Sequence, residues 1–125
     1  MQPHDLTPSQ LTEVIIRCSY QVSNVLGSGF VEKVYENALA YELGKAGLRG
    51  LQQHPIKVMY DGIIVGDFVA DLLVEGQVLV ELKAVRALED VHTAQCLNYL
   101  KATGIRTCLL LNSGRPRVEI RRLVL

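Results

Sequence analysis

Charged residues interrupt the most apolar part of this chain. The segment DFVADLLVEGQVLVELKAV, residues 67–85, is typical of two β-strands joined by a short turn, and both strands are rich in Val and Leu. Asp71, Glu81 and Lys83 nevertheless lie inside these strands. A buried charge is costly unless another group compensates it. The fold must therefore bring these three side chains to a place where they are compensated.

The turn between the two strands determines which charges meet. If EGQ is a three-residue loop, Val74 pairs with Val78, and counting inward places Asp71 directly opposite Glu81. Directly opposed residues share a face, with Cβ atoms roughly 5 Å apart. Lys83 lies two residues further along that face. Strict alternation gives one face of the first strand to the residues Asp67, Val69, Asp71 and Leu73.

Two carboxylates this close repel each other unless a proton or a cation lies between them. Mg²⁺ (or Mn²⁺) would suit Asp71 and Glu81, because hard divalent cations prefer carboxylate oxygens. A lysine beside such an ion can orient or activate a water, or stabilise negative charge that develops on a phosphate. The alternative is a salt-bridged trio in which Lys83 only neutralises the acids, and the spacing alone leaves both interpretations open.

The rest of the chain predicts one α/β domain, residues 1–125. A capping box at Thr7 and Gln10, with Pro8 at the first helical position, predicts a first helix that Gly27 and Gly29 end. We expect further helices over about residues 30–46 and 88–103. Five segments rich in Val, Ile and Leu predict strands. The order α-α-β-β-β-α-β-β predicts a mixed β-sheet flanked by helices.

Polar side chains recur on two of the predicted helices. Glu32 and Glu36 fall on the same helical stripe as Tyr35 and the apolar residues that follow it. A favourable charge near a helix N-terminus explains Glu32 better than Glu36, and it explains neither acid facing inward. The last helix carries a polar line at helical spacing: His92, Gln95 and Tyr99. A buried amide such as that of Gln95 requires hydrogen-bond partners.

Composition and cysteine usage favour a cytoplasmic protein. The 13 basic and 13 acidic residues cancel, which does not favour a monomer that binds nucleic acid through net charge alone. Cys18, Cys96 and Cys108 lack the spacing of a disulfide framework and are interpreted as free thiols in a reducing compartment. The N-terminal MQPHDLTPSQ has no features of a targeting signal, and no apolar run approaches the length of a membrane span.

These motifs together resemble a known family. The segment DFVADLLV…VLVELKAV resembles the D-x(n)-E-x-K core of the PD-(D/E)XK nuclease superfamily. GFVEKVYE matches a G-x-x-E-x-x-Y signature through Gly29, Glu32 and Tyr35, and VHTAQCLNYLKATG resembles the Q-x-x-x-Y helix of related nucleases. The likeness spans roughly residues 8–125 and is that of the small bacterial GxxExxY proteins. One departure is that Ala70 stands where a Pro often precedes the first acid.

The resemblance implies a restriction-endonuclease-like fold and Mg²⁺-dependent phosphodiester hydrolysis of DNA or RNA by a metal-activated water. It implies that metal is held by Asp71 and Glu81, supplemented by Glu32 or Glu36, and that Lys83 assists the nucleophile. The residues expected to act in catalysis are Asp71, Glu81, Lys83, Gln95 and Glu36. Those expected to contact the substrate are Tyr35, His92, Tyr99, Arg121 and Arg122.

Two other interpretations remain open from the sequence. One is a catalytically silent module on the same fold that binds nucleic acid or a protein partner, which the zero net charge and short chain would suit. The other is a structural partner in a homodimer. The tail RPRVEIRRLVL bears on both, because its arginines could contact phosphates or protect an exposed strand edge.

Overall fold

The computed structural model describes residues 5–125, so the expectation about targeting signals rests partly on residues 1–4, outside the described part. The predicted order of elements is confirmed. The helices are α1 (Pro8–Leu26), α2 (Glu32–Lys45) and α3 (Asp90–Thr103). The strands are β1 (Gly50–Tyr60), β2 (Ile63–Val74), β3 (Val78–Lys83), β4 (Thr107–Asn112) and β5 (Glu119–Val124). Within residues 5–125 no helix combines the length and apolar character needed to cross a membrane.

Local signals in the sequence form as expected. Thr7 caps α1 through the N–H of Gln10, whose side chain accepts the Thr7 N–H in return. The β1–β2 turn is made by Asp61 and Gly62, both in the left-handed region, as a tight hairpin requires. The EGQ loop gives the predicted pairing of Val74 with Val78. These elements are therefore specified by neighbouring residues.

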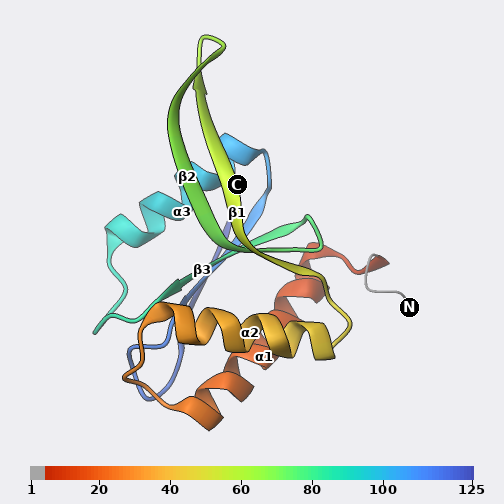
Figure 1. Cartoon of the computed structure of the whole chain (residues 1–125), viewed down its shortest axis with the longest axis vertical. Coiled ribbons are helices and arrows are strands. Elements are labelled where there is room, and N and C mark those ends of the chain that lie inside the picture. Colours follow the sequence, from red (N-terminus) through yellow and green to blue (C-terminus); the bar gives the residue numbers. More distant parts are fainter. Residues whose placement is uncertain (1–4) are drawn as a thin grey trace.

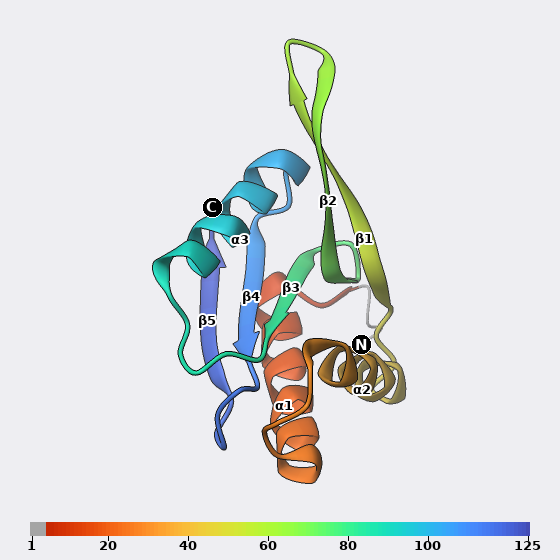
Figure 2. The same cartoon turned by 60° about the vertical axis from the view of Figure 1, so that its left-hand side comes forward.

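The five strands form one mixed sheet in the order β1-β2-β3-β4-β5. Only β3 and β4 run parallel, because α3 crosses over between them, and the other neighbours are antiparallel. Helices α1 and α2 cover one face of the sheet, and α3 covers the other (Figures 1 and 2). Val78, Val80 and Leu82 of β3 pack toward α1 and α2, whereas Leu79 packs toward α3.

Strand β2 changes its partners and its orientation at Asp71. Its pairing with β3 is confined to residues 72–74, and its pairing with β1 passes over Gln53 and Asp71. Gln53 has a φ of 57°, a left-handed conformation that only few residues other than Gly adopt. Beyond this break, β1 and β2 leave the sheet as a long twisted hairpin, which Figure 2 shows rising away from β3.

The break overturns the prediction of strict alternation along β2. Leu72 packs with α1 and α2, yet Ala70, two residues earlier, packs on the α3 side with Leu73. In an unbroken strand Leu72 and Ala70 would share a face. The strand therefore rotates at Asp71, and the predicted common face of Asp67, Val69, Asp71 and Leu73 does not persist through it.

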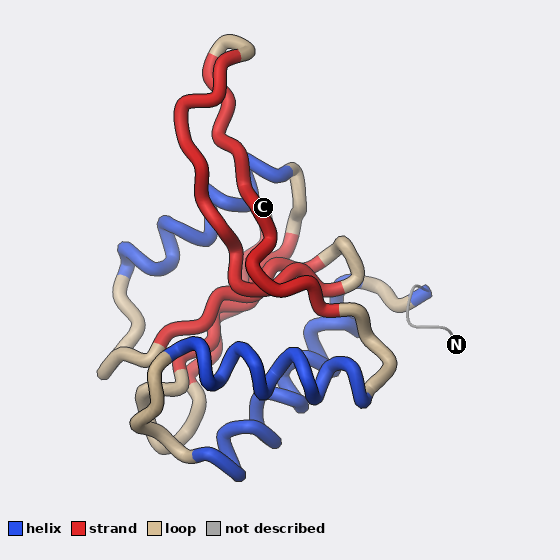
Figure 3. The backbone as a smooth tube through the Cα atoms, in the orientation of Figure 1, coloured by secondary structure: helices blue, strands red, loops and turns tan. Residues whose placement is uncertain are grey.

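The outer half of the hairpin projects beyond the helices (Figure 3). Several of its large apolar side chains are exposed to solvent, among them Met59, Tyr60, Ile63, Ile64 and Val65. A two-stranded hairpin has little stability of its own in water. Its inner half is held by the sheet and by α3, and its outer half presents apolar surface.

Hydrogen bonds from the end of β4 hold the chain segment that directly follows β3. The Asn112 side-chain oxygen accepts the N–H groups of Val85 and Gly114, its amide donates to the Val85 carbonyl, and the Ser113 N–H donates to the Lys83 carbonyl. Gly114 lies against this segment. A Cβ atom at Gly114 would lie 2.8 Å from the carbonyl carbon of Ala84 and closer still to the Val85 backbone. This contact fixes the strand end that carries Lys83.

We expect Gly114→Ala to destabilise the protein by about 2–3 kcal/mol, because backbone atoms cannot move aside as a flexible side chain can. The free energy of unfolding from urea denaturation measures the effect. Gly44→Ala is the matched control, since Gly44 lies within α2 with open space around it, and there alanine should be neutral or stabilising by up to about 1 kcal/mol. Equal stability of the two variants would contradict the assigned packing of Gly114.

Candidate active site

The break in β2 leaves the Asp71 carboxylate beside β3. Its Oδ2 atom accepts the Leu82 N–H at 2.8 Å. Leu82 lies two residues beyond Val80, the last β3 residue paired with β2, so its N–H has no partner strand on that side. Asp71 thus replaces a ladder hydrogen bond at the point where the two strands separate. Asp71 and Glu81 follow the last pair of the ladder, Leu72 with Val80, and do not themselves pair as the turn register predicts. The two carboxyl groups are nevertheless close enough for the charge of Asp71 to act on Glu81.

Glu81 is a buried acid without full compensation. Its side chain is 3% exposed, and its Oε1 atom is the one buried side-chain oxygen or nitrogen in residues 5–125 that has no hydrogen-bond partner. Burial, and after it the negative charge of Asp71, raises the pKa of Glu81 to about 9, while Lys83 acts in the opposite direction. In the absence of a cation, the pair therefore keeps a proton at neutral pH.

One side-chain hydrogen bond connects Lys83 to α3, and a second one continues from it along the helix. Its Nζ atom donates to Gln95 Oε1 at 3.1 Å, and Gln95 Nε2 donates to the Tyr99 hydroxyl at 3.1 Å. The Tyr99 ring is buried, and burial followed by the charge of Glu81 raises the pKa of its hydroxyl. These contacts give the predicted buried amide of Gln95 its partners. They place Gln95 and Tyr99 beside the carboxylate pair.

The donor set of Asp71 and Glu81 fits a divalent cation. Two adjacent carboxylates, one with an unpartnered buried oxygen, supply the oxygen ligands and negative charge that Mg²⁺ and Mn²⁺ prefer. No group of three or more His, Cys, Asp or Glu side chains suited to a metal forms within residues 5–125. Mg²⁺ can be bound by one or two carboxylates, with water or phosphate oxygens completing its shell.

Glu32 and Glu36 contact other parts of the fold. Glu32 Oε1 accepts the Ala84 N–H at 3.2 Å, directly after Lys83. Glu36 is buried and accepts hydrogen bonds from Lys33, Gln52 and Gln53. The structure thus brings Glu32 to the end of β3 and Glu36 to the irregular part of β1. The expectation that both acids face inward is correct for Glu36 and wrong for Glu32, which is exposed because it lies at the very start of α2. Neither joins Asp71 and Glu81 in a group of three acids, given the described residues.

The candidate substrate-contacting residues are distributed more widely. The Tyr35 hydroxyl is used within the fold, where it donates to the Gly27 carbonyl at 2.7 Å and accepts the Phe30 N–H. His92 Nδ1 accepts the Glu89 N–H and caps α3. Their roles toward a substrate stay predictions.

The two arginines of β5 differ in their surroundings. Arg121 donates to the Thr93 hydroxyl at 2.8 Å and to the Leu88 carbonyl at 3.1 Å, and so ties β5 to the start of α3. Arg122, the next residue, is exposed. The register gives Arg121 the same face of the sheet as Glu81 and places Arg122 on the opposite face, toward α1 and α2. The roles of both arginines toward a phosphate stay predictions.

Sequence reasoning missed two residues that shape this region. Gln53 redirects β1 opposite Asp71 through its left-handed backbone, and Gln is not a residue type that signals such a conformation. Phe68 packs its ring against Tyr99, with centroids 5.9 Å apart. Phe68 lies only three residues before Asp71 in the sequence, which could have drawn attention to it. Strict alternation, however, placed Phe68 and Asp71 on opposite faces of the strand.

Comparison with known proteins agrees with this geometry. A family model described as the PD-(D/E)XK nuclease superfamily matches residues 9–123. The fold is similar to the crystal structure of an alkaline exonuclease from Laribacter hongkongensis, with a TM-score of 0.56 and 12% identity over 94% of this chain and 70% of that chain. This likeness confirms the expected restriction-endonuclease-like fold. A search of curated proteins found no match.

The raised pKa of Glu81 predicts an unusual pH dependence of stability when metal is removed by a chelator. An unfolded chain releases this proton near pH 4.5, whereas the folded protein holds it to about pH 9. The free energy of unfolding should therefore fall as pH rises between these values. Glu81→Gln removes this loss, so we expect the variant to be more stable than the parent by on the order of 1–3 kcal/mol at pH 8, and equal to it near pH 5.

Denaturant unfolding at several pH values in EDTA measures this difference. Glu13→Gln, at an exposed position of α1, is the control and should follow the parent protein at every pH. A Glu81→Gln variant that is less stable than the parent at pH 8 would show that Glu81 is compensated in the metal-free fold.

Proposed function

Because the chain belongs to the PD-(D/E)XK nuclease superfamily, we propose that it is a nuclease that hydrolyses phosphodiester bonds of DNA or RNA with Mg²⁺ or Mn²⁺. Nucleases of this superfamily generally use divalent metal ions. The observation that carries the proposal is the unpartnered, buried Oε1 of Glu81 beside Asp71, with Lys83 nearby on the same strand. A fold that needed these residues only for packing would gain nothing from an uncompensated buried acid.

In this proposal Asp71 and Glu81 hold the metal ion. When bound, the ion would supply Lewis-acid chemistry, lowering the pKa of a water and neutralising charge on the phosphate. Gln95 positions the Lys83 ammonium by accepting one of its three N–H groups, which leaves two donors for a water or a phosphate oxygen. Tyr99 in turn holds the Gln95 amide. Gln95 and Tyr99 thus orient the lysine.

The contacts of Glu36 support a positioning role. Its carboxylate holds the Gln52 and Gln53 side chains at the irregular part of β1, opposite the break that frees Asp71. Glu32 holds the chain directly after Lys83 through the Ala84 N–H, which supports a positioning role for it as well. Tyr35, His92, Arg121 and Arg122 are retained as candidate substrate contacts, and of the two arginines only Arg121 shares a sheet face with Glu81.

The finer assignment to the bacterial GxxExxY proteins is supported by how the signature is used. Gly29 has a φ of 116° in the loop before α2, Glu32 is the first residue of α2, and Tyr35 closes that loop through Gly27. The buried free cysteines support the expected reducing cytoplasm. The exposed apolar hairpin would supply a surface for the homodimer that the sequence left as an open alternative.

We expect cleavage of a panel of single-stranded and duplex DNA and RNA in Mg²⁺ or Mn²⁺, and its abolition in EDTA. Asp71→Asn and Lys83→Ala should each lower the rate by at least about 100-fold, because the first weakens metal binding and the second removes a positioned cation. Rates of release of labelled fragments measure the effect.

Exposed residues of the same types provide matched controls. Asp67→Asn changes an exposed aspartate further along β2 that is ion-paired with Lys57, and Lys45→Ala changes an exposed lysine of α2. Both should retain the parent rate. If the purified protein cleaves no substrate with either metal, the nuclease proposal is wrong, and metal-independent binding of nucleic acid would then favour the catalytically silent module.

Measurements of metal affinity should distinguish the acids that bind the ion from those that do not. We expect Asp71→Asn and Glu81→Gln to weaken Mn²⁺ binding at least about ten-fold in calorimetric titration, because each removes a ligand charge. Glu36→Gln should lower the melting temperature but change the Mn²⁺ dissociation constant by less than about three-fold. A ten-fold loss of affinity in Glu36→Gln would instead make it a metal ligand.

A further inference from the structure

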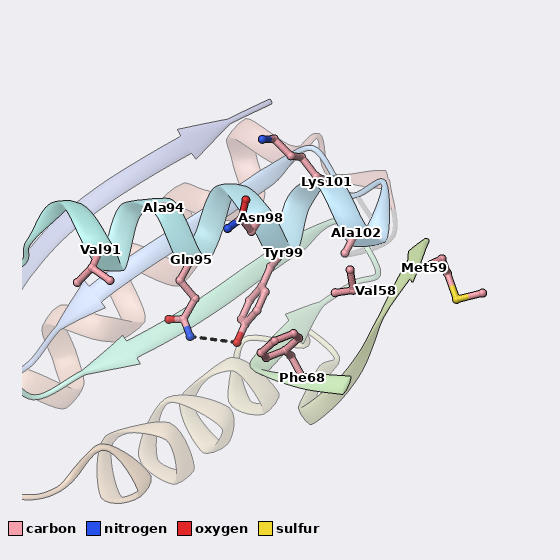
Figure 4. Close-up of a pocket in the computed structure, with 10 residues that line it drawn as sticks. All are labelled: Val58, Met59, Phe68, Val91, Ala94, Gln95, Asn98, Tyr99, Lys101 and Ala102. Atoms are coloured by element: carbon pink, nitrogen blue, oxygen red, sulfur yellow. Dashed lines mark hydrogen bonds between the residues drawn. The ribbon is translucent and has the colours of Figure 1, made fainter. Parts of the chain in front are cut away.

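An open hollow of about 610 Å³ lies between α3 and the hairpin (Figure 4). One wall is the face of α3 that carries Gln95 and Tyr99, and the other is formed by β1 and β2 where they leave the sheet. Its lining is largely apolar, and none of its ten residues is acidic. A hollow of this size and character is typical of sites that take a small planar group.

Two aromatic rings lie together in the lining. Phe68 is 48% exposed, and its ring is tilted 44° from the Tyr99 ring with centroids 5.9 Å apart. Figure 4 shows the Phe68 ring beside the Tyr99 ring, below α3. A half-exposed phenylalanine offers a face on which a nucleobase can stack. Asn98, exposed on α3 between Gln95 and Lys101, adds an amide that can both donate to and accept from the edge of a base.

The hollow is continuous with the candidate active site. Tyr99 gives its ring to the hollow, while its hydroxyl accepts from Gln95, which in turn accepts from Lys83. The charge of Glu81 acts on the same hydroxyl. Lys101 is also in the lining, so lysines lie at the active site and along the hollow. This charge pattern suits a phosphate backbone that runs past both places.

We propose that this hollow receives the unstacked base of a nucleotide adjacent to the phosphate that is cleaved, with Phe68 as its stacking platform. The inference rests on the proposed nuclease function and narrows its substrate to single-stranded or unpaired nucleic acid. A base paired and stacked within a duplex has neither face free for Phe68 and cannot leave the helix without losing its pairing. An unpaired base can enter while its phosphate lies at Asp71 and Glu81.

The substitution Phe68→Trp provides a direct fluorescent probe, because the chain contains no Trp. We expect the emission of Phe68→Trp to be quenched by a single-stranded oligonucleotide in Ca²⁺, which replaces Mg²⁺ so that binding is measured without cleavage. A duplex of the same sequence, and a single-stranded abasic backbone of the same length, should bind at least about ten-fold more weakly and quench less, because neither offers a free base.

Truncation tests the same contact in the otherwise unchanged chain. Phe68→Ala should weaken binding of a labelled single strand roughly ten-fold, as expected for loss of one stacked base, and leave binding of the abasic strand unchanged. Phe30→Ala is the matched control, since Phe30 is 49% exposed but lies in the loop before α2, away from the hollow. It should bind as the parent does. Circular dichroism of each variant verifies that it is folded.

The outcomes separate this inference from the nuclease proposal. If the protein cleaves duplex and single strands equally and Phe68→Ala changes neither binding nor cleavage, the inference is overturned and the nuclease function stands. If single strands quench the emission of the Phe68→Trp variant but the parent protein cleaves nothing in any metal, the result would support base binding in the hollow and contradict the nuclease proposal. If no oligonucleotide quenches the emission of the Phe68→Trp variant, the inference is also overturned. Quenching that increases with the concentration of the variant itself, without any oligonucleotide, would instead indicate that the hollow is an interface between two copies of the chain.

Discussion

The separation of β2 from β3 at Asp71 is the constraint on which the candidate site depends. In a regular sheet, the carboxylates at two opposed positions would lie among ladder hydrogen bonds and neighbouring strands. Here the pairing ends at Leu72, and the side chain of Asp71 takes over the free N–H of Leu82. The left-handed backbone of Gln53 allows β1 to follow the same change of direction. Backbone strain of this kind tends to be found where a side chain must be presented for function.

The electrostatics of the pair have a consequence for folding as well as for chemistry. Asp71 has a backbone donor and partial exposure, whereas Glu81 is buried and lacks a partner for one oxygen. Burial and the charge of Asp71 raise the pKa of Glu81, so in the metal-free protein the unfavourable electrostatic energy falls on Glu81. A divalent cation would offset both the repulsion and the burial. Metal binding in such a site would thus stabilise the fold and release a proton together.

Much of this arrangement could be predicted from the sequence, because it depends on short-range signals. The capping box of α1, the Asp61–Gly62 turn and the three-residue EGQ loop are each set by a few neighbouring residues. The EGQ loop fixes the pairing of β2 with β3 as far as Leu72 and Val80, the residues next to Asp71 and Glu81. The position of α2 could not be predicted in this way. A helical wheel shows that Glu36 faces inward, but only the sheet determines that it meets Gln52 and Gln53 of β1.

The rotation of β2 could not be predicted from the alternation of side chains along the strand. Alternation assumes an unbroken strand, and no residue type near Gln53 or Asp71 announces the break. Its effect extends past the carboxylates, because turning the strand moves Ala70 to the α3 side and brings the Phe68 ring against Tyr99. The single change of backbone direction that frees Asp71 therefore also opens the hollow beside α3. Gln95 and Tyr99, which lie between the two, hold the lysine on one side and line the hollow on the other.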